Sequence, residues 1–451
     1  MDQRFDVIVI GSGTAGSTVA SMCRSAGWSV AVVDSLPFGG TCALRGCDPK
    51  KVLVGAAELL DFSRRLRATE SVTGTLQIDW PKLINFKRSF TDPVPKQKEQ
   101  SFQNAGIKSF HGRTRFVDAH SIEVAGQRFD ARFIVIAAGA RPATLDIPGE
   151  EHLITSTQFL ELQQLLSEVV FVGGGYIAME FAHVAARAGA RPTVLHRGER
   201  VLERFDPDLV SKLTTHSEKL GIVLHTRTTV EAIEKSGDGF VVHASQHGEK
   251  KSFSCDLAVH AAGRVPDIDD MGLEKGNVER AKNGGVKVNR LLQSVSNPTV
   301  YAGGDAAATD GLPLTPVAGY DGKVIATNLL EGNRLKAEYE AIPTVVFTVP
   351  ALASVGLSED AAKRKGVHFQ KNYLDIGGWY SSRRVGERTA AVKVLVDEDS
   401  DRILGAHLLG PAAEETINLF VLAMRTGITA KELKQVLFAY PTHASDVQYM
   451  V

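Results

Sequence analysis

Cysteine is scarce in this sequence, which has four cysteines among 451 residues. Few cysteines, together with an N-terminus that lacks a signal-peptide cleavage region, are typical of a protein from a reducing compartment. We therefore expect a cytoplasmic location. In such a compartment a close cysteine pair is more often catalytic than structural, so Cys42 and Cys47 are the first candidates for chemistry.

An excess of charge and long apolar runs are also missing. The formal net charge is -1, which gives no electrostatic reason to expect nucleic acid or an anionic membrane as a partner. No apolar run approaches the roughly 20 residues of a membrane helix. The apolar fraction of 43% and the 42 glycines instead predict a globular chain rich in tight turns, and its length predicts two to four domains.

A dinucleotide-binding pattern opens the chain. The apolar run 5–10 predicts a buried parallel strand, and the glycine pattern G-x-G-x-x-G follows at Gly11, Gly13 and Gly16. A helix comes next, and a second strand ends at Asp34. In this order the glycines let the backbone approach a pyrophosphate at the helix N-terminus, and the carboxylate of Asp34 holds ribose hydroxyls.

The pattern repeats in the middle of the chain. The apolar run 169–172 leads into Gly173 and Gly175, a helix follows, and the next strand reaches His196. The distance from Gly11 to Asp34 and that from Gly173 to His196 are both 23 positions. We therefore predict two superposable units that bind two nucleotides.

The residue that reads the ribose differs between the two units. An acid at this position favours a free 2′-hydroxyl, whereas bases favour a 2′-phosphate. The second unit has His196, followed by Arg197, Arg200 and Arg204. These residues predict NADPH rather than NADH; the alternative is that the arginines belong to a solvated loop.

The remaining segments complete the predicted architecture. After Ile342-Pro343, long strands alternate with helices, which is typical of a compact α+β module. The predicted fold class is α/β, with two Rossmann-like dinucleotide-binding domains and a C-terminal α+β domain. We place the first domain at residues 1–147 and 264–338, the second at 148–263 and the third at 339–451.

Several motifs follow one another along the chain: Gly11–Gly16, Gly40-Thr41-Cys42 with Cys47 to Lys51, Ala137-Ala138-Gly139, Gly173–Ala178 with Glu180, Gly304-Asp305, Leu314–Ala318 and 342–347. In this order they resemble those of the FAD-dependent pyridine nucleotide-disulfide oxidoreductases, the family of glutathione reductase, dihydrolipoamide dehydrogenase and mercuric reductase. The resemblance implies FAD in the first unit, the nicotinamide dinucleotide in the second and a homodimer formed through the C-terminal module.

The same resemblance assigns roles to individual residues. Cys47 is implied to face the flavin, and Cys42 to be the interchange thiol that meets substrate. Thiol–disulfide exchange needs such a pair, because one thiolate attacks and a second releases the mixed disulfide. Lys51 matches the family lysine beside the flavin ring, Glu180 matches its partner, and Tyr176 matches the tyrosine that gates the nicotinamide pocket. Further residues implied to bind the cofactors are Gly40, Thr41, Ala138, Gly139, Gly263, Asp305 (the flavin's ribityl chain), Thr315 and Ala318.

The C-terminal tail departs from the family pattern. Tyr440 stands where the family has its histidine acid/base, and Ser445 stands where the orienting glutamate belongs. A tyrosine titrates near pH 10, so it is a poor base at neutral pH but an adequate hydrogen-bond donor or metal ligand. His443, with Asp446, is the alternative acid/base group; the competing interpretation is that it has no catalytic role.

These departures leave the electron acceptor open. The first hypothesis is an NADPH-dependent disulfide reductase acting on a small disulfide or thiol-reactive compound. A metal ion or quinone acceptor, as in mercuric reductase, is favoured by Tyr440, although the C-terminal cysteine pair of that enzyme is absent. The family arginines that bind glutathione fall on Ser21 and Lys323, and dihydrolipoamide dehydrogenase has an acid where His196 stands. A redox-sensing flavoprotein is disfavoured by the intact nicotinamide unit. No metal site of the protein's own is expected.

Overall fold

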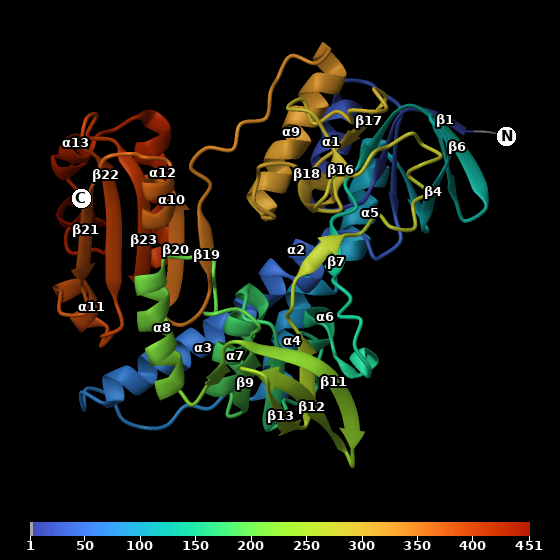
Figure 1. Ribbon diagram of the computed structural model, residues 1–451. Coiled ribbons are helices and arrows are strands. Elements are labelled where there is room, and N and C mark those ends of the chain that lie inside the picture. The colour runs from blue at the N-terminus through green and yellow to red at the C-terminus, as the bar shows by residue number, and fades with distance from the viewer. Residues whose placement is uncertain (1–2) are drawn as a thin grey trace. The chain divides into compact units, whose positions relative to one another are not determined.

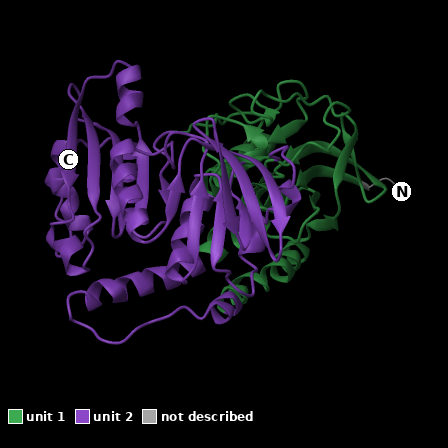
Figure 2. Cartoon of the chain, turned by 60° about the horizontal axis from the view of Figure 1, so that its bottom comes forward, with its two compact units in different colours: residues 1–50, 86–143, 264–339 green, residues 51–85, 144–263, 340–451 purple. Residues whose placement is uncertain are grey.

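The computed structural model describes residues 3–451 and divides into two compact units (Figure 2). Unit 1 comprises residues 1–50, 86–143 and 264–339, and unit 2 comprises residues 51–85, 144–263 and 340–451. The three-domain division drawn from the sequence is finer than this partition and stays a prediction. Within residues 3–451, no helix is long and apolar enough to cross a membrane.

Unit 1 is built on a seven-stranded sheet with the order β3-β2-β1-β6-β5-β4, in which β17 also pairs with β6 (Figure 1). The strands β3, β2, β1, β6 and β17 pair in parallel, whereas β4, β5 and β6 pair antiparallel. Val7, Ile8 and Val9 are fully buried, as expected for a parallel strand covered on both faces. The strands are β1 (Gln3–Ile10), β2 (Val30–Asp34), β3 (Lys108–His111), β4 (Thr114–Asp118), β5 (Ser121–Val124), β6 (Gln127–Ile136) and β17 (Val300–Ala302).

Two helices of unit 1 cover one face of this sheet. Helix α1 (Thr14–Ser25) packs against α9 (Thr315–Glu331), and Val19 and Val324 share a buried cluster with Val7 and Val9 of β1. This packing holds the N-termini of both helices beside the glycine loop that follows β1. The smaller elements of unit 1 are α2 (Gly40–Arg45), α5 (Val94–Ala105), β7 (Ala140–Pro142), β15 (Arg264–Pro266), β16 (Val286–Lys287), η2 (Gly304–Ala306) and β18 (Ala307–Ala308).

The middle of the chain forms a second parallel sheet, in unit 2, with the order β10-β9-β8-β14. An antiparallel sheet, β11-β12-β13, follows it. Ala178, Ala182 and Ala185 of helix α7 are fully buried beside the parallel sheet, because their small side chains let the helix approach closely. The elements are α6 (Ser156–Phe159), β8 (Glu168–Val172), α7 (Tyr176–Arg187), β9 (Arg191–Leu195), α8 (Pro207–Lys219), β10 (Val223–His225), β11 (Thr228–Ser236), β12 (Gly239–Gln246), β13 (Glu249–Cys255) and β14 (Leu257–His260).

The C-terminal segment adds a five-stranded antiparallel sheet to unit 2, with the order β19-β20-β23-β22-β21. Its core joins strand residues such as Val392 and Ala406 to Ile417 and Phe420 of helix α12. The elements are β19 (Thr344–Val346), β20 (Ala351–Gly356), α10 (Glu359–Arg364), β21 (Phe369–Asp375), α11 (Tyr380–Arg384), β22 (Ala391–Asp397), β23 (Ile403–Gly410), α12 (Ala413–Thr426), α13 (Ala430–Lys434) and η3 (Ala444–Tyr449).

Within each of two helices, the chain passes from one unit to the other. Helix α3 (Cys47–Arg67) begins at the second cysteine of the pair, and α4 (Trp80–Thr91) follows it. In unit 2, α3 contributes Asp61, whose carboxylate receives hydrogen bonds from the guanidinium of the fully buried Arg187. Such a pair needs both partners, because a lone buried charge is costly.

Candidate active site

The two cysteines lie on either side of a break between two helices. Cys42 belongs to α2, Gly46 ends that helix, and Cys47 is the first residue of α3. Both are free cysteines, not joined in a disulfide. The Sγ of Cys47 is 3.4 Å from the hydroxyl of Thr315 at the start of α9, and the thiol of Cys42 points to the Asp48 carboxylate at 3.9 Å.

The two thiols differ in acidity. A hydrogen bond from Cys42 is the main cause that lowers the pKa of Cys47 to about 6; the Thr315 hydroxyl and the charge of Lys50 also lower it, against the effects of burial and Asp48. The same hydrogen bond, followed by burial, raises the pKa of Cys42 far above its usual range. At neutral pH the pair therefore carries one thiolate, on Cys47, and one proton, on Cys42.

Two adjacent lysines follow the cysteine pair in the sequence and have different surroundings. Lys50 is the lysine whose positive charge lowers the pKa of Cys47. In unit 2, the ammonium of Lys51 pairs with Glu58 at 2.9 Å and lies 4.6 Å from the centre of the Phe347 ring. The assignment of Lys51 to the flavin stays a prediction, and Lys50 is a residue that the sequence reasoning missed. The signal was present, because both lysines lie within one turn of Cys47.

Two predicted residues on α7 lie beside the segment at 344–347 in unit 2. Glu180 is buried and accepts a hydrogen bond from the backbone N–H of Phe347 at 2.9 Å. The hydroxyl of Tyr176 bonds to that of Thr344 at 2.5 Å, and burial raises the Tyr176 pKa. Both side chains are thus fixed by the C-terminal segment, although the residues are far apart in sequence.

The first glycine loop forms a cradle that excludes side chains. A Cβ on Gly11 would lie 2.2 Å from the carbonyl oxygen of Ala137, and one on Gly16 would lie 2.0 Å from that of Gly11. Gly40 has φ +76°, and its Cβ would lie 2.5 Å from the Cα of Gly13. Backbone therefore packs on backbone at the N-termini of α1 and α2, which fits the pyrophosphate of a dinucleotide such as FAD.

Asp34 anchors this loop from the end of β2. One carboxylate oxygen accepts hydrogen bonds from the backbone N–H and the hydroxyl of Ser12, at 2.8 and 2.6 Å. The other accepts from the N–H of Leu36 at 2.9 Å. The structure thus gives Asp34 a local role in shaping the loop, and its predicted role toward the ribose stays a prediction.

A partly buried acid and base, Asp305 and Arg264, lie elsewhere in unit 1. Burial raises the pKa of Asp305, and the positive charge of Arg264 opposes this effect. Burial lowers the pKa of Arg264, whose guanidinium donates to the carbonyl oxygen of Ala140. The oxygen atoms of this aspartate can accept hydrogen bonds from ligand hydroxyls.

Other predicted cofactor residues surround these groups. The backbone oxygen of Gly139, which has φ +70°, accepts a hydrogen bond from the N–H of Asp267, and Ala138 packs against the core of the sheet. A Cβ built on Gly304 would lie 3.3 Å from the Cβ of Ala318, which is one turn after Thr315 on α9. Thr41 is half-buried on α2.

The second glycine loop repeats the geometry of the first. Gly173 has φ +117°, and its Cβ would lie 2.2 Å from the carbonyl oxygen of Ala261, just as Gly11 faces Ala137. Gly175 caps α7 with extended backbone. Apart from the residues next to them in the chain, no atom of the described residues lies within 4 Å of a Cβ built on Gly175 or on Gly263. The loop therefore has open space before a helix N-terminus, as a bound dinucleotide requires.

The basic residues after β9 separate in the structure. His196 Nε2 lies 3.4 Å from the carboxylate of Glu203, and Arg197 is exposed. The guanidinium of Arg200 donates to the backbone oxygen of Glu203 at 2.6 Å, and its second Nη is buried without a hydrogen-bond partner in the described chain. Residue types alone predict neither the contact of His196 with Glu203 nor the direction of the Arg200 side chain.

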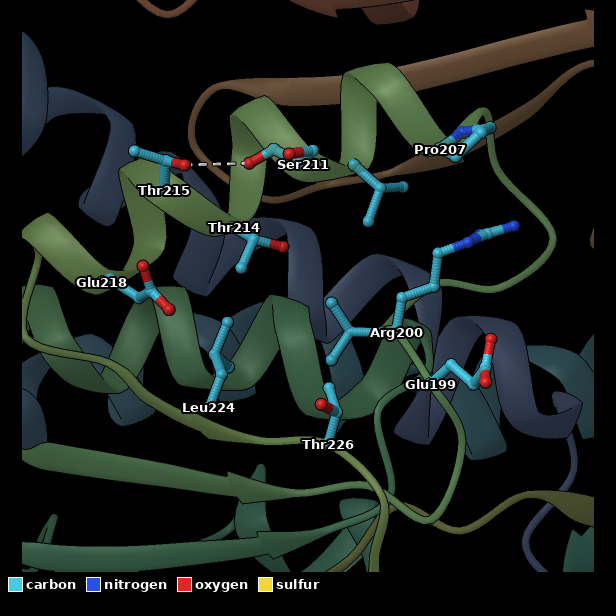
Figure 3. A pocket seen from close by; sticks show the side chains of 11 residues that line it. Glu199, Arg200, Pro207, Ser211, Thr214, Thr215, Glu218, Leu224 and Thr226 are labelled. Atoms are coloured by element: carbon cyan, nitrogen blue, oxygen red, sulfur yellow. Dashed lines mark hydrogen bonds between the residues drawn. The ribbon is translucent and has the colours of Figure 1, made fainter.

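Arg200 lines a cavity of about 310 Å³ within unit 2. Figure 3 shows helix α8, with Ser211 and Thr214, on one side of this cavity and Leu224 and Thr226 on the other. Arg200 extends from the loop that carries Glu199.

The tail presents Tyr440 and His443 differently. Tyr440 is 81% exposed in the chain. His443 is half-buried, and burial lowers its pKa, with Asp446 opposing and Arg384 reinforcing this shift. Neither residue is in the same unit as the cysteine pair. No cluster of three or more metal-ligating side chains is found in residues 3–451.

Comparison with known proteins adds independent information. A family model described as pyridine nucleotide-disulphide oxidoreductase matches residues 5–322, and the dimerisation domain of the same description matches residues 342–451. A mercuric reductase from Lysinibacillus sphaericus is 30% identical over 450 residues, which are 99% of this chain and 82% of the relative. A chloroplastic/mitochondrial glutathione reductase from Pisum sativum is 32% identical over 464 residues, covering 98% and 81% of the two chains.

A solved structure extends this likeness to three dimensions. The Cu(II) complex of the HOCl-induced flavoprotein disulfide reductase RclA from Escherichia coli matches with a TM-score of 0.90 and 26% identity, covering 100% of this chain and 99% of that one. Together with the two family models, this match confirms the predicted fold class: two Rossmann-like dinucleotide-binding domains and a C-terminal α+β dimerisation domain.

Proposed function

Because this chain belongs to the pyridine nucleotide-disulphide oxidoreductase family, whose members bind FAD, we propose that it passes electrons from NADPH to a disulfide between Cys42 and Cys47 and on to a small disulfide or thiol-reactive substrate. The observation that carries the proposal is the place of the pair: Cys42 and Cys47 flank the break between α2 and α3, and the Cys47 sulfur lies 3.4 Å from the Thr315 hydroxyl. The lowered pKa of Cys47 and the raised pKa of Cys42 support it. A redox-active dithiol needs one sulfur ready to act as a nucleophile and a partner within bonding reach.

When bound, FAD would supply the two-electron chemistry that connects a hydride donor to a disulfide. Gly11, Gly13, Gly16, Gly40 and Asp305 would hold FAD, since they make the cradle and the partly buried acid of unit 1. The two cysteines carry out the reduction of the substrate.

Substrate reduction follows as two exchanges. Cys42 loses its proton and attacks one sulfur of the substrate disulfide, forming a mixed disulfide and releasing the first substrate thiolate. Cys47 then attacks the Cys42 sulfur, which re-forms the internal disulfide and releases the second thiolate. The Asp48 carboxylate, 3.9 Å from the Cys42 sulfur, can take up the Cys42 proton, so that Cys47 stays a thiolate for the second exchange. This arrangement lessens the need for a histidine at the tail.

A second candidate acceptor is a soft or redox-active metal ion, bound as substrate, or a quinone. Two thiol sulfurs at one helix break suit a soft metal ion, and Tyr440 is exposed in the tail. The relatives include a mercuric reductase and a Cu(II) complex of a flavoprotein disulfide reductase, which supports this candidate beside glutathione-type disulfides.

We also propose that the enzyme prefers NADPH and works as a homodimer. The preference is supported by His196 and Arg197 at the end of β9, where an acid would favour NADH. The homodimer is supported by the dimerisation-domain match at residues 342–451. Tyr440 and His443 are the tail residues proposed to act on the substrate's protons or to bind a metal substrate.

The test is steady-state turnover of the FAD-loaded enzyme with NADPH against panels of disulfides, metal salts and quinones. Cys42→Ser should abolish turnover of every disulfide substrate. Acceptors reduced equally well by Cys42→Ser would receive electrons without the thiol pair, and a panel containing only such acceptors would contradict the proposal.

A further inference from the structure

The second nucleotide unit carries an acid of its own at the place where a 2′-phosphate would be read. We propose that the Glu203 carboxylate competes with the coenzyme's 2′-phosphate for His196, and that Glu203 therefore limits the preference for NADPH over NADH. The inference rests on the proposed use of NADPH, and it assigns to Glu203 the role of a specificity-determining residue.

The position of the carboxylate is the first support. Its Oε1 lies 3.4 Å from His196 Nε2. It also lies against the backbone of Gly198, since a Cβ there would come within 1.8 Å of the same oxygen. The His196 side chain is 14% exposed, whereas that of Glu203 is 57% exposed. The Glu203 carboxylate thus lies back against the turn at Gly198, next to the imidazole of His196, which is largely buried.

The neighbouring charges do not offset this acid. Arg200 is turned toward the backbone oxygen of Glu203 and the cavity beside α8 (Figure 3). The charge of Arg204 acts on the Tyr176 hydroxyl at the start of α7. Glu199, the other acid of the loop, is paired with Arg227 at 2.9 Å. His196 and Arg197 are left as the bases at the end of β9, and Glu203 opposes them.

The consequence depends on the coenzyme. NADPH brings a phosphate that repels the carboxylate and needs the same imidazole donor, so Glu203 must swing away into solvent. NADH brings a 2′-hydroxyl, which a carboxylate accepts without conflict. Because the contact is partly exposed, the effect is a modest one, roughly three- to tenfold in the ratio of the two specificity constants.

The experiment compares three variants of the FAD-loaded enzyme. Glu203→Gln removes the negative charge that lies against His196. Glu199→Gln is the matched control, because it removes a negative charge from the same loop that is paired with Arg227 instead. Arg197→Ala tests the proposed phosphate reading itself. The readouts are kcat/KM with NADPH and with NADH, and the Kd of adenosine 2′,5′-bisphosphate and of 5′-AMP by calorimetry, which does not depend on the electron acceptor.

Glu203→Gln should raise the NADPH/NADH ratio by roughly three- to tenfold and tighten the bisphosphate similarly, with little change for 5′-AMP. Glu199→Gln should leave both ratios within about twofold, because its charge is already paired. Equal effects of the two glutamine variants, or none for Glu203→Gln while Arg197→Ala weakens the bisphosphate, would overturn the role of Glu203. If Arg197→Ala changes neither ligand, the proposed phosphate reading fails instead.

Discussion

The Cys47 sulfur lies 3.4 Å from the hydroxyl of Thr315, a residue 268 positions later in the chain. The contact exists because α9 packs on α1 and begins, at Thr315, beside the break between α2 and α3. It places a hydroxyl donor on the one sulfur of the pair whose pKa is lowered. The reactivity of the site is therefore set by tertiary structure as well as by the cysteine spacing.

The first prediction concerns pH. Since the pKa of Cys47 is lowered to about 6, Cys47 is a thiolate above that pH and a thiol below it. In the reduced protein with its native cysteine pair, the rate of Cys47 alkylation by iodoacetamide, measured by mass spectrometry, should rise with pH to a plateau, with a midpoint near 6. Cys42→Ala removes the largest stabilising hydrogen bond, so the midpoint should move upward in that variant. An unchanged midpoint would contradict the described coupling.

The second prediction concerns Thr315. Thr315→Val keeps the shape of the side chain but removes the donor to Cys47, so the alkylation midpoint of Cys47 should move to higher pH. Thr315→Ser retains a hydroxyl and should stay close to the unchanged protein. If the valine and serine variants behave alike, the hydroxyl does not stabilise the thiolate.

The third prediction separates two adjacent lysines. Lys50→Met should raise the Cys47 midpoint, because the positive charge of Lys50 lowers that pKa. Lys51→Met is the matched control, since its ammonium is engaged with Glu58, and it should move the midpoint less. A larger shift in Lys51→Met than in Lys50→Met would contradict the dominant effect of the Lys50 charge on Cys47.

The fourth prediction concerns acid stability. In unit 2, His216 Nε2 donates to the Val349 carbonyl at 3.1 Å, and its Nδ1 accepts from the Thr389 hydroxyl at 3.0 Å. Burial is the main cause that lowers the pKa of His216 to about 4, below its ordinary 6.5. The folded state thus keeps it neutral, and between pH 6.5 and 4 only the unfolded state takes up the proton. Its contribution to stability is complete above pH 6.5 and falls by up to about 1.4 kcal/mol per pH unit as the pH drops toward 4.

His216→Gln tests this sign, because a glutamine can keep both hydrogen bonds and does not titrate. Urea unfolding at pH 7 and pH 5 should show a smaller loss of stability on acidification for the variant than for the unchanged protein. Equal losses in the two proteins would mean that another group, and not His216, titrates in this range.

Much of the fold could be predicted from residue patterns that act locally. Gly11 and Gly173 must be glycines, because the backbone after a neighbouring strand fills the space that a side chain would need. The equal spacing in the two repeats predicted both parallel sheets. The family relationship followed from motif order and is confirmed by the comparisons.

The parts of the site that could not be predicted depend on side-chain direction or on distant packing. Lys50 and Lys51 are neighbours in sequence, and only their orientation on α3 decides which charge reaches Cys47. Arg200 belongs to a basic loop by its sequence, yet its guanidinium turns to Glu203. The contact between Glu203 and His196 depends on the fold of a turn that no residue type specifies.

The central claim is that Cys42 and Cys47 form a disulfide reduced at the expense of NADPH. It is tested most directly by differential alkylation and mass spectrometry of the oxidised, FAD-loaded protein, before and after anaerobic addition of NADPH. We predict that Cys42 and Cys47 are unlabelled before NADPH and labelled after it, while the buried Cys23 and Cys255 stay unlabelled throughout. Equal labelling of Cys42 and Cys47 before and after NADPH would contradict the account.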